Sequence, residues 1–264
     1  MKIATHHVYL PAIATLALAF THGGDARAQS YFIAGLGATP EYEGATDRQT
    51  IPFIAARVSF GKRYLALDGL TAQANLIASR TWEAGPAVAF IFGRNGSVKN
   101  SAVALLPEID DAVHAGFFVA RNWSGIAAAN DTISAAVQLT KDVSDVYDGW
   151  MLIPSMSYSH EMSDRITVSY KVSFGIVSDK YAQTYFSVSQ NDAAKSGLSS
   201  FTAAGGVKDA GFTFGWTYAI GANWSVNGFS DYRRLLGDAA KSPIVKKGGD
   251  ADQFSVGLGV GLSF

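Results

Sequence analysis

The sequence predicts an all-β transmembrane antiparallel β-barrel of about twelve strands. Its last eleven residues, 254–264, alternate strictly: even positions are apolar, odd positions are glycine or serine, and the stretch ends on the aromatic Phe264. Successive side chains of a strand point to opposite faces, so one face of this segment is apolar and the other is nearly bare. A barrel in a lipid bilayer needs such an outer face and leaves no strand edge unpaired. We therefore interpret Phe264 as a barrel-assembly residue at the C-terminus.

The composition favours a membrane barrel over a soluble β-sandwich. Charged residues make up 16 % of the chain, against about 25 % in a typical globular domain. The polar face of the predicted strands is mostly Ser, Thr, Gly, Asn and Gln, which suits a narrow lumen. The net charge of −1 provides no basic field, which argues against a nucleic-acid partner. The chain has no cysteine, which excludes disulfides, thiolate metal sites and a lipidated cysteine.

The N-terminus has the pattern of a secretory signal peptide. Lys2 precedes an apolar run at 8–20, and Ala26, Arg27 and Ala28 form a small-x-small cleavage site. The run is shorter than the ~20 residues of a transmembrane helix. We predict a cleaved signal peptide at 1–28 and a single barrel domain at 29–264.

Alternating apolar and polar residues define the strands along the rest of the chain. Residues 166–176 and 212–220 show the pattern clearly, with apolar side chains at the even positions. The pattern predicts strands at 30–38, 50–60, 62–68, 70–79, 81–93, 111–121, 125–140, 149–161, 164–177, 208–220, 222–234 and 253–264. Twelve is an even number, as in single-chain bacterial barrels.

The predicted connections alternate between long and short. Short turns centre on Gly61, Arg80, 122–124, 162–163 and 221–222, and longer loops follow the first, fifth, seventh, ninth and eleventh strands. Short periplasmic turns and long outer loops are typical of outer-membrane barrels, so both termini are expected in the periplasm. The connection at Asp68 and Gly69 is an exception, because an outer loop is expected there and the sequence leaves little room for one.

Charged residues on the lumen face and one long loop raise the question of a pore. The strand alternation predicts that five charged side chains point into the lumen, where they could line a channel or close it through ion pairs. They are Arg165, Lys171, Asp209, Asp231 and Arg233. The longest connection, 178–207, contains Tyr185 and Phe186, aromatic residues that are unfavourable in a fully hydrated loop. We predict that this segment folds against the barrel as a plug and narrows any pore.

The sequence predicts no catalytic, cofactor or metal site. The predicted mature chain has two histidines, His114 and His160, and the neighbours Ser159 and His160 point to opposite faces of one strand, so they cannot pair directly. His114 is interpreted as a polar lumen residue. The acidic residues Asp142, Asp145 and Asp148 suit a hard cation but lack EF-hand spacing, and we interpret them as a solvated loop.

Several segments resemble one known family. They are Pro40-Glu41-Tyr42-Glu43-Gly44, Tyr185-Phe186-Ser187-Val188, the stretch 197–209 with Gly205-Gly206-Val207-Lys208-Asp209, and Leu236-Gly237-Asp238-Ala239-Ala240-Lys241-Ser242-Pro243. Together with the glycine-rich last strand they resemble the MipA/OmpV family of MltA-interacting outer-membrane proteins, over essentially the whole mature chain. The resemblance implies a Gram-negative outer-membrane barrel without established catalytic residues.

The resemblance also implies a function. Its namesake member is a scaffold between a murein-cleaving lytic transglycosylase and a murein synthase, so we expect a non-enzymatic scaffold linking the outer membrane to peptidoglycan synthesis. The alternatives are a narrow channel for small solutes and a surface adhesin acting through the outer loops, with an outer-membrane lipid hydrolase more distant. Expected partners are outer-membrane lipid and lipopolysaccharide, and a periplasmic murein hydrolase or synthase; no cofactor is expected.

Overall fold

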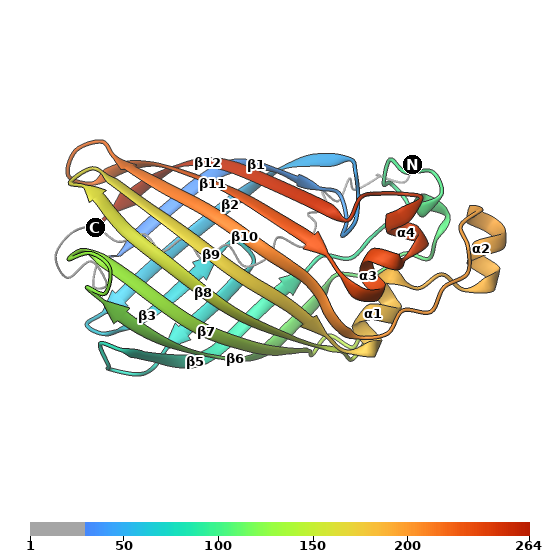
Figure 1. Cartoon of the computed structure of the whole chain (residues 1–264), viewed down its shortest axis with the longest axis horizontal. Helices are drawn as coiled ribbons and strands as arrows, with labels where there is room; N and C mark the ends of the chain where they lie inside the picture. The colour runs from blue at the N-terminus through green and yellow to red at the C-terminus, as the bar shows by residue number, and fades with distance from the viewer. Residues whose placement is uncertain (1–29) are drawn as a thin grey trace, which may run out of the picture.

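The computed structural model describes residues 30–264, which form a closed barrel of twelve antiparallel strands (Figure 1). The predicted fold and strand number are confirmed, whereas the predicted signal peptide lies outside the described residues. The strands are β1 (Tyr31–Pro40), β2 (Arg48–Phe60), β3 (Arg63–Asp68), β4 (Thr71–Asn75), β5 (Trp82–Ile91), β6 (Ala112–Ser124), β7 (Asp131–Asp142), β8 (Trp150–Ser163), β9 (Ile166–Val177), β10 (Gly206–Ala219), β11 (Trp224–Leu235) and β12 (Asp252–Ser263).

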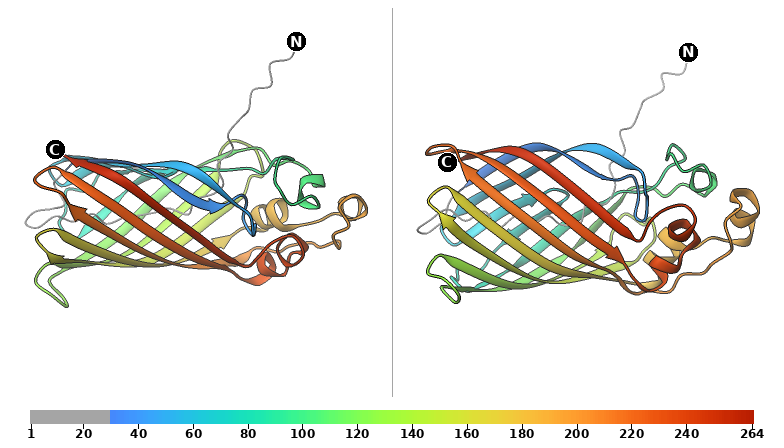
Figure 2. Two further views of the ribbon diagram at one scale, coloured as in Figure 1. Left: turned by 90° about the horizontal axis from the view of Figure 1, so that it is seen from above. Right: turned by 45° about the horizontal axis from the view of Figure 1, so that its top comes forward.

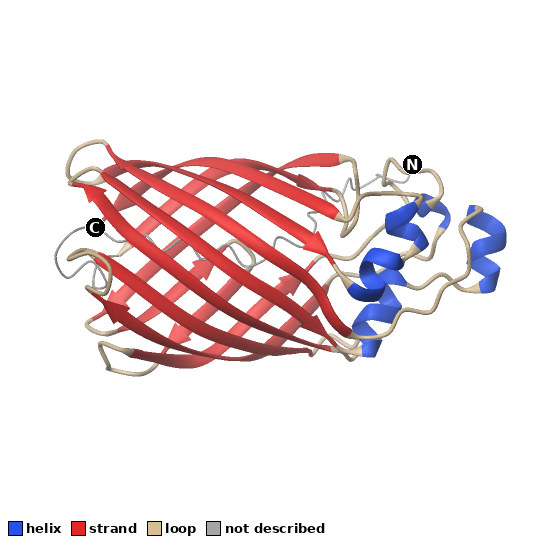
Figure 3. Cartoon of the chain, viewed as in Figure 1, coloured by secondary structure: helices blue, strands red, loops and turns tan. Residues whose placement is uncertain are grey.

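The two ends of the barrel differ in their connections. Short turns and the C-terminus lie at one end, which we call the short-turn end, and all helices of the described chain lie at the other, the long-loop end (Figures 2 and 3). The helices are the 3₁₀ helix η2 (Val103–Leu105), α1 (Asp179–Phe186), α2 (Gln190–Ser196), α3 (Gly237–Lys241) and α4 (Pro243–Lys246). Within residues 30–264, none of these helices has the length and apolar character needed to cross a membrane.

Closure of the barrel depends on the pairing of β1 with β12, from Tyr31 opposite Ser263 to Ala38 opposite Val256. The outward positions of β12 are apolar, and Leu258 is 60 % exposed on the surface that faces lipid. Three inward positions are glycines because neighbouring groups occupy the space: a Cβ on Gly257 would lie 2.3 Å from the Phe229 ring, and one on Gly261 would lie 2.6 Å from the Ser225 hydroxyl. The alternation that predicted the last strand therefore reflects lipid on one side and crowded aromatic packing on the other.

Polar side chains bonded between neighbouring strands and across the lumen fill much of the interior. Thr213 donates to Asp231 at 2.7 Å, Thr217 donates to Asn227 at 2.9 Å, and Gln73 donates to Gln138 of β7 at 2.9 Å. A buried polar group costs little free energy only when it is hydrogen-bonded. The interior is thus a packed polar core rather than an empty tube.

The wall is incomplete near the long-loop end, beside the short hairpin of β3 and β4. β2 pairs with β3 only from Ala55 to Phe60, and the turn residue Gly69 donates its N–H to the Ile54 carbonyl at 3.0 Å. Beyond this turn, residues 48–53 of β2 pair only with β1 in the strand ladders that the structure describes. The unusually short connection seen in the sequence therefore produces a notch between β2 and β5. Pro52 lies on this edge, where its lack of an N–H leaves one donor fewer to satisfy.

The two largest differences between predicted and observed strand boundaries occur where side chains hold the turns. The turn predicted at 122–124 lies at 125–130, since the Asp131 carboxylate accepts the backbone N–H groups of Ile126, Ala127 and Ala128 at 2.7–2.9 Å. The strand predicted at 70–79 ends at Asn75, whose side chain bonds backbone groups of Lys62, Ile77 and Ala84.

Replacing Gly257 with valine should destabilise the closed barrel, because the added side chain collides with the Phe229 ring. Overpacking of this kind costs about 1–3 kcal/mol. We expect the heat-modifiable band of the folded protein to be lost at a lower temperature on electrophoresis. Val260→Leu, on the lipid-facing side of the same strand, is the matched control and should leave that temperature nearly unchanged; equal shifts in both variants would contradict the packing argument.

Candidate functional site

Helix α1 packs over the mouth of the barrel at the long-loop end (Figure 1). Its Tyr181, Tyr185 and Phe186 are buried, and the spacing of these residues places them on one face of the helix. Ser178 caps the helix by accepting the Tyr181 N–H at 3.4 Å. The segment predicted to act as a plug therefore folds over the barrel, with Tyr185 and Phe186 on its inner side.

Three tyrosines form the contact between α1 and the barrel. Tyr181 and Tyr185 stack with ring centroids 4.5 Å apart, and Tyr147 from the β7–β8 loop meets both edge-on at 5.4 and 5.6 Å. The Tyr181 hydroxyl donates to Glu43 at 3.0 Å, and the Tyr185 hydroxyl donates to the Phe92 carbonyl at 3.2 Å. Burial raises the pKa of all three tyrosines above its ordinary value, so they remain neutral hydrogen-bond donors.

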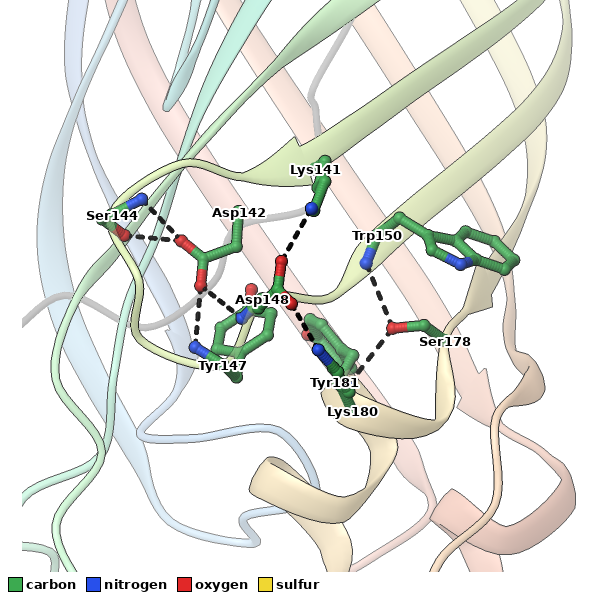
Figure 4. A network of polar contacts seen from close by, with 9 residues as sticks. All are labelled: Lys141, Asp142, Ser144, Tyr147, Asp148, Trp150, Ser178, Lys180 and Tyr181. Atoms are coloured by element: carbon green, nitrogen blue, oxygen red, sulfur yellow. Dashed lines mark hydrogen bonds and ion pairs between the residues drawn. The ribbon is translucent and has the colours of Figure 1, made fainter.

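The β7–β8 loop is fixed by two carboxylates with different partners (Figure 4). Asp142 accepts the backbone N–H groups of Ser144, Tyr147 and Asp148 at 2.7–2.9 Å, which shapes the loop from within. Asp148 forms ion pairs with Lys141, at 2.7 Å, and with Lys180 of α1. Two of the three acidic residues noted in the sequence, Asp142 and Asp148, are thus bound to backbone and lysines, and no group of residues suited to a metal ion is found within residues 30–264.

A chain of alternating charges lies beneath α1. Lys208 contacts Glu43 at 2.5 Å and Asp209 at 2.6 Å, and Asp209 also contacts Arg233, whose guanidinium lies 3.8 Å from Asp231. Lys208 and Asp209 are only 5 % and 1 % exposed. Buried charges are tolerated when each is paired, because desolvation of an unpaired ion is very costly.

Beneath this network the lumen holds a small cavity of about 90 Å³. It is enough for several water molecules at most. Apolar side chains of β5 and β8 line one part of it, and charged side chains of β9 to β11 line another. Lys171, Asp209, Asp231 and Arg233, four of the residues assigned to the lumen phase, line this cavity.

Arg165 does not lie where the sequence placed it. Strand β9 begins at Ile166, so Arg165 lies in the short β8–β9 turn and is exposed. Sequence analysis also missed Lys208 as a lumen residue, because the register shifts between Val207 and Asp209. Such a bulge breaks the two-residue alternation and lets both Lys208 and Asp209 face inward. Glu43 and Tyr181 were missed as well, since they lie in irregular or helical segments where strand alternation carries no information.

The outer connections also pack against one another. Buried apolar side chains from the β1–β2, β5–β6, β9–β10 and β11–β12 connections form one cluster: Tyr42, Ala45, Val103, Leu106, Val188, Leu198 and Ile244. Ser242, preceding α4, donates its hydroxyl to the Phe186 carbonyl at 2.7 Å, which links the last connection to α1. Several loops, and not α1 alone, therefore hold the covered mouth.

The remaining residues considered in the sequence lie apart from this mouth, except His114. The ring nitrogens of His114 lie 3.2 Å from the Thr140 hydroxyl and 2.5 Å from the Tyr147 hydroxyl, so it supports the β7–β8 loop. Ser159 is buried in the lumen, whereas His160 stacks on Tyr158, with ring centroids 6.2 Å apart. Phe264 is 66 % exposed at the short-turn end, where its N–H bonds the Ser30 carbonyl at 3.0 Å.

Acidification should loosen α1 through Asp148. Its ion pairs with Lys141 and Lys180 hold the pKa of the carboxyl at about 2, below the value of about 3.9 expected in the unfolded chain. The stabilisation is therefore present above pH 4 and is lost as the pH falls towards 2. We expect pepsin cleavage within 178–205 to rise over this range in the wild type. In Asp148→Asn cleavage should already be raised at pH 4 and should change less; Asp145→Asn is the control, and parallel profiles for wild type and Asp148→Asn would contradict this role.

Comparison with known proteins places the chain in a family. The family model described as MltA-interacting protein MipA matches residues 33–264.

Similar solved structures include the NanC porin, with 9 % identity and a TM-score of 0.47 over 88 % of this chain and 98 % of that chain. An outer-membrane channel from Pseudomonas putida F1 has 11 % identity and a TM-score of 0.44 over 89 % and 95 % of the two chains. OmpT of Vibrio cholerae has 7 % identity and a TM-score of 0.41 over 89 % and 96 %. No curated protein matches the sequence. Because the family model spans nearly the whole barrel, the chain belongs to the MltA-interacting protein MipA family of outer-membrane barrel proteins.

Proposed function

We propose that this protein is a non-enzymatic scaffold that anchors a periplasmic murein enzyme to the outer membrane. The observation that supports the proposal is the covered mouth: α1 and its tyrosines pack over the long-loop end, and the charge chain from Glu43 to Asp231 lies inside the lumen beneath them. A barrel obstructed in this way would act through its surfaces. The family description, MltA-interacting protein, supports a murein-cleaving enzyme as the partner.

The arrangement of the serine and histidine residues supports a role without catalysis. Ser159 is buried in the lumen, and its neighbour His160 belongs to the opposite face of β8. A hydrolase of the serine type needs these groups within hydrogen-bonding distance of each other, with an acid that orients the histidine. Lipid hydrolysis by this pair is therefore not part of the proposal.

The short-turn end offers a defined surface for a periplasmic partner. Short turns face the periplasm in outer-membrane barrels. Ile126 in the β6–β7 turn is 63 % exposed, and its backbone is fixed by the Asp131 carboxylate, which accepts its N–H at 2.9 Å. A rigid turn that presents an apolar side chain loses little conformational entropy on binding. We propose that Ile126 is an anchor residue for the partner.

Replacing Ile126 with aspartate should weaken binding of a purified MltA-type lytic transglycosylase to the refolded protein. Loss of an apolar anchor costs about 1–2 kcal/mol, which corresponds to roughly 5- to 30-fold in Kd. Biolayer interferometry on detergent-solubilised protein measures the change. Val143→Asp is the matched control, because Val143 is similarly exposed, at 58 %, but lies in a long-loop connection. Equal affinities for wild type and Ile126→Asp would remove Ile126 from the interface, and absence of binding to the wild type would overturn the scaffold proposal.

A gated channel for small solutes is the second candidate, favoured by the polar cavity beneath α1. The β9–β10 ladder begins at Val177 and Gly206, so residues 179–204 can be replaced by a short glycine-serine linker without cutting a strand. In planar bilayers we expect the wild type to be silent. Stepwise conductance of the wild type would favour the channel over a permanently closed scaffold. The linker variant is the control, because removal of α1 should open the lumen whichever function is correct.

A further inference from the structure

A shallow groove crosses the lipid-facing wall of the barrel from β5 to β9. Its volume is about 440 Å³, and its lining includes Trp82, Arg121, Ala135, Pro154 and Met156. It lies on the outside of the wall, apart from the lumen and the closed mouth. Its lining is apolar except near one end, where the cation of Arg121 lies.

The strand register explains the shape of the groove. Trp82 lies beside Arg121, Arg121 beside Ala135, and Ala135 beside Met156, so these four side chains form one row across β5 to β8. In the next row, Val137 lies beside Pro154. The methyl group of Ala135 between two long side chains leaves the depression. The alanine is therefore the position at which the groove can be filled by substitution.

The groove is inclined relative to the membrane. Trp82 is the first residue of β5, at the short-turn end, whereas Met156 is near the middle of the fourteen-residue strand β8. The strands tilt, so a row that begins at the periplasmic rim reaches the middle of the wall. Between β5 and β9 the row crosses four strand spacings, or about 19 Å. A flexible chain lying in the groove would run from the interface towards the bilayer centre.

Arg121 places an uncompensated positive charge at the periplasmic end of this groove. Its guanidinium lies 5.3 Å from the Trp82 ring centre and 5.0 Å from that of Trp123, and it forms no ion pair with an acidic residue within residues 30–264. A lipid-facing arginine costs least free energy near the interface, where tryptophans also gather. Its planar guanidinium suits two hydrogen bonds to a phosphate.

We propose that the groove binds a glycerophospholipid of the periplasmic leaflet. The phosphate is held by Arg121 between the two tryptophans, and one acyl chain lies over Ala135 and along Pro154 and Met156. The cation selects a phosphate headgroup, the apolar floor accepts a chain, and the position at the short-turn end selects the periplasmic leaflet. The proposal does not depend on the scaffold function, because the groove and the turns are separate surfaces.

Native mass spectrometry of the refolded protein tests the site with palmitoyl-oleoyl phosphatidylglycerol as the probe. We expect one retained lipid in the wild type and about a tenfold weaker Kd in both Arg121→Gln and Ala135→Trp. Arg121→Lys keeps the charge and should bind with intermediate affinity. Arg63→Gln is the matched control, since Arg63 is an exposed arginine at the same end whose side chain bonds the Leu76 carbonyl at 2.9 Å. Heat-modifiable mobility verifies that each variant is folded.

Four results would overturn the proposal. Retention of the lipid by both Arg121→Gln and Ala135→Trp would show that it binds elsewhere. An equal loss in Arg63→Gln would indicate nonspecific attraction to cationic residues. Dioleoylglycerol lacks the phosphate, so Arg121→Gln should not change its binding, and an equal loss for both lipids would exclude phosphate recognition. A dimer disrupted by Ala135→Trp, with unchanged lipid binding, would assign the groove to a second copy of the chain.

Discussion

The pairing of β1 with β12 is the constraint on which the rest of the structure depends. Backbone polar groups have no water to bond within a bilayer, so a sheet in lipid must close on itself. Closure brings Gly257 and its neighbours against the rings of Phe53 and Phe229, which meet edge to face at 5.4 Å. The same strand therefore joins the sheet ends, presents Leu258 to lipid and leaves room for the aromatic packing inside.

Closure also determines how charge is distributed. A closed barrel confines ionisable side chains that point inward, and each must find a partner of opposite sign or leave the interior. Lys208 satisfies this by contacting Glu43 and Asp209 together, so the charge chain joins the first outer connection to strands β10 and β11. The network that keeps the lumen polar thus also anchors the loops over the mouth. For this reason we regard the mouth and the lumen as one structural unit.

Much of the wall could be predicted from the sequence, because lipid outside and polar side chains inside impose a period of two. The limits of the prediction appear where another interaction controls the backbone. Asp131 and Asn75 hold turns through side-chain bonds that alternation does not reveal. The bulge before Asp209 brings Lys208 inward against its phase, and Arg165 shares the phase of the lumen yet lies in a turn. At the mouth, the aromatic character of Tyr185 and Phe186 predicted that these side chains would be buried. It did not predict the residues that they contact, which come from distant loops.

The separation of inside from outside limits where function can reside. Packing and ion pairs account for the side chains inside the barrel, so the residues that still need an explanation lie mainly on the surfaces. Two such surface residues are Ile126, an apolar side chain exposed in a turn held by the Asp131 carboxylate, and Arg121, a cation on an apolar wall. Ile126 lies at the short-turn end and Arg121 faces lipid, so the two proposed contacts would use separate surfaces at the same end of the barrel. A scaffold positioned between the outer membrane and murein would need both contacts, one to hold its partner and one to fix its own depth in the bilayer.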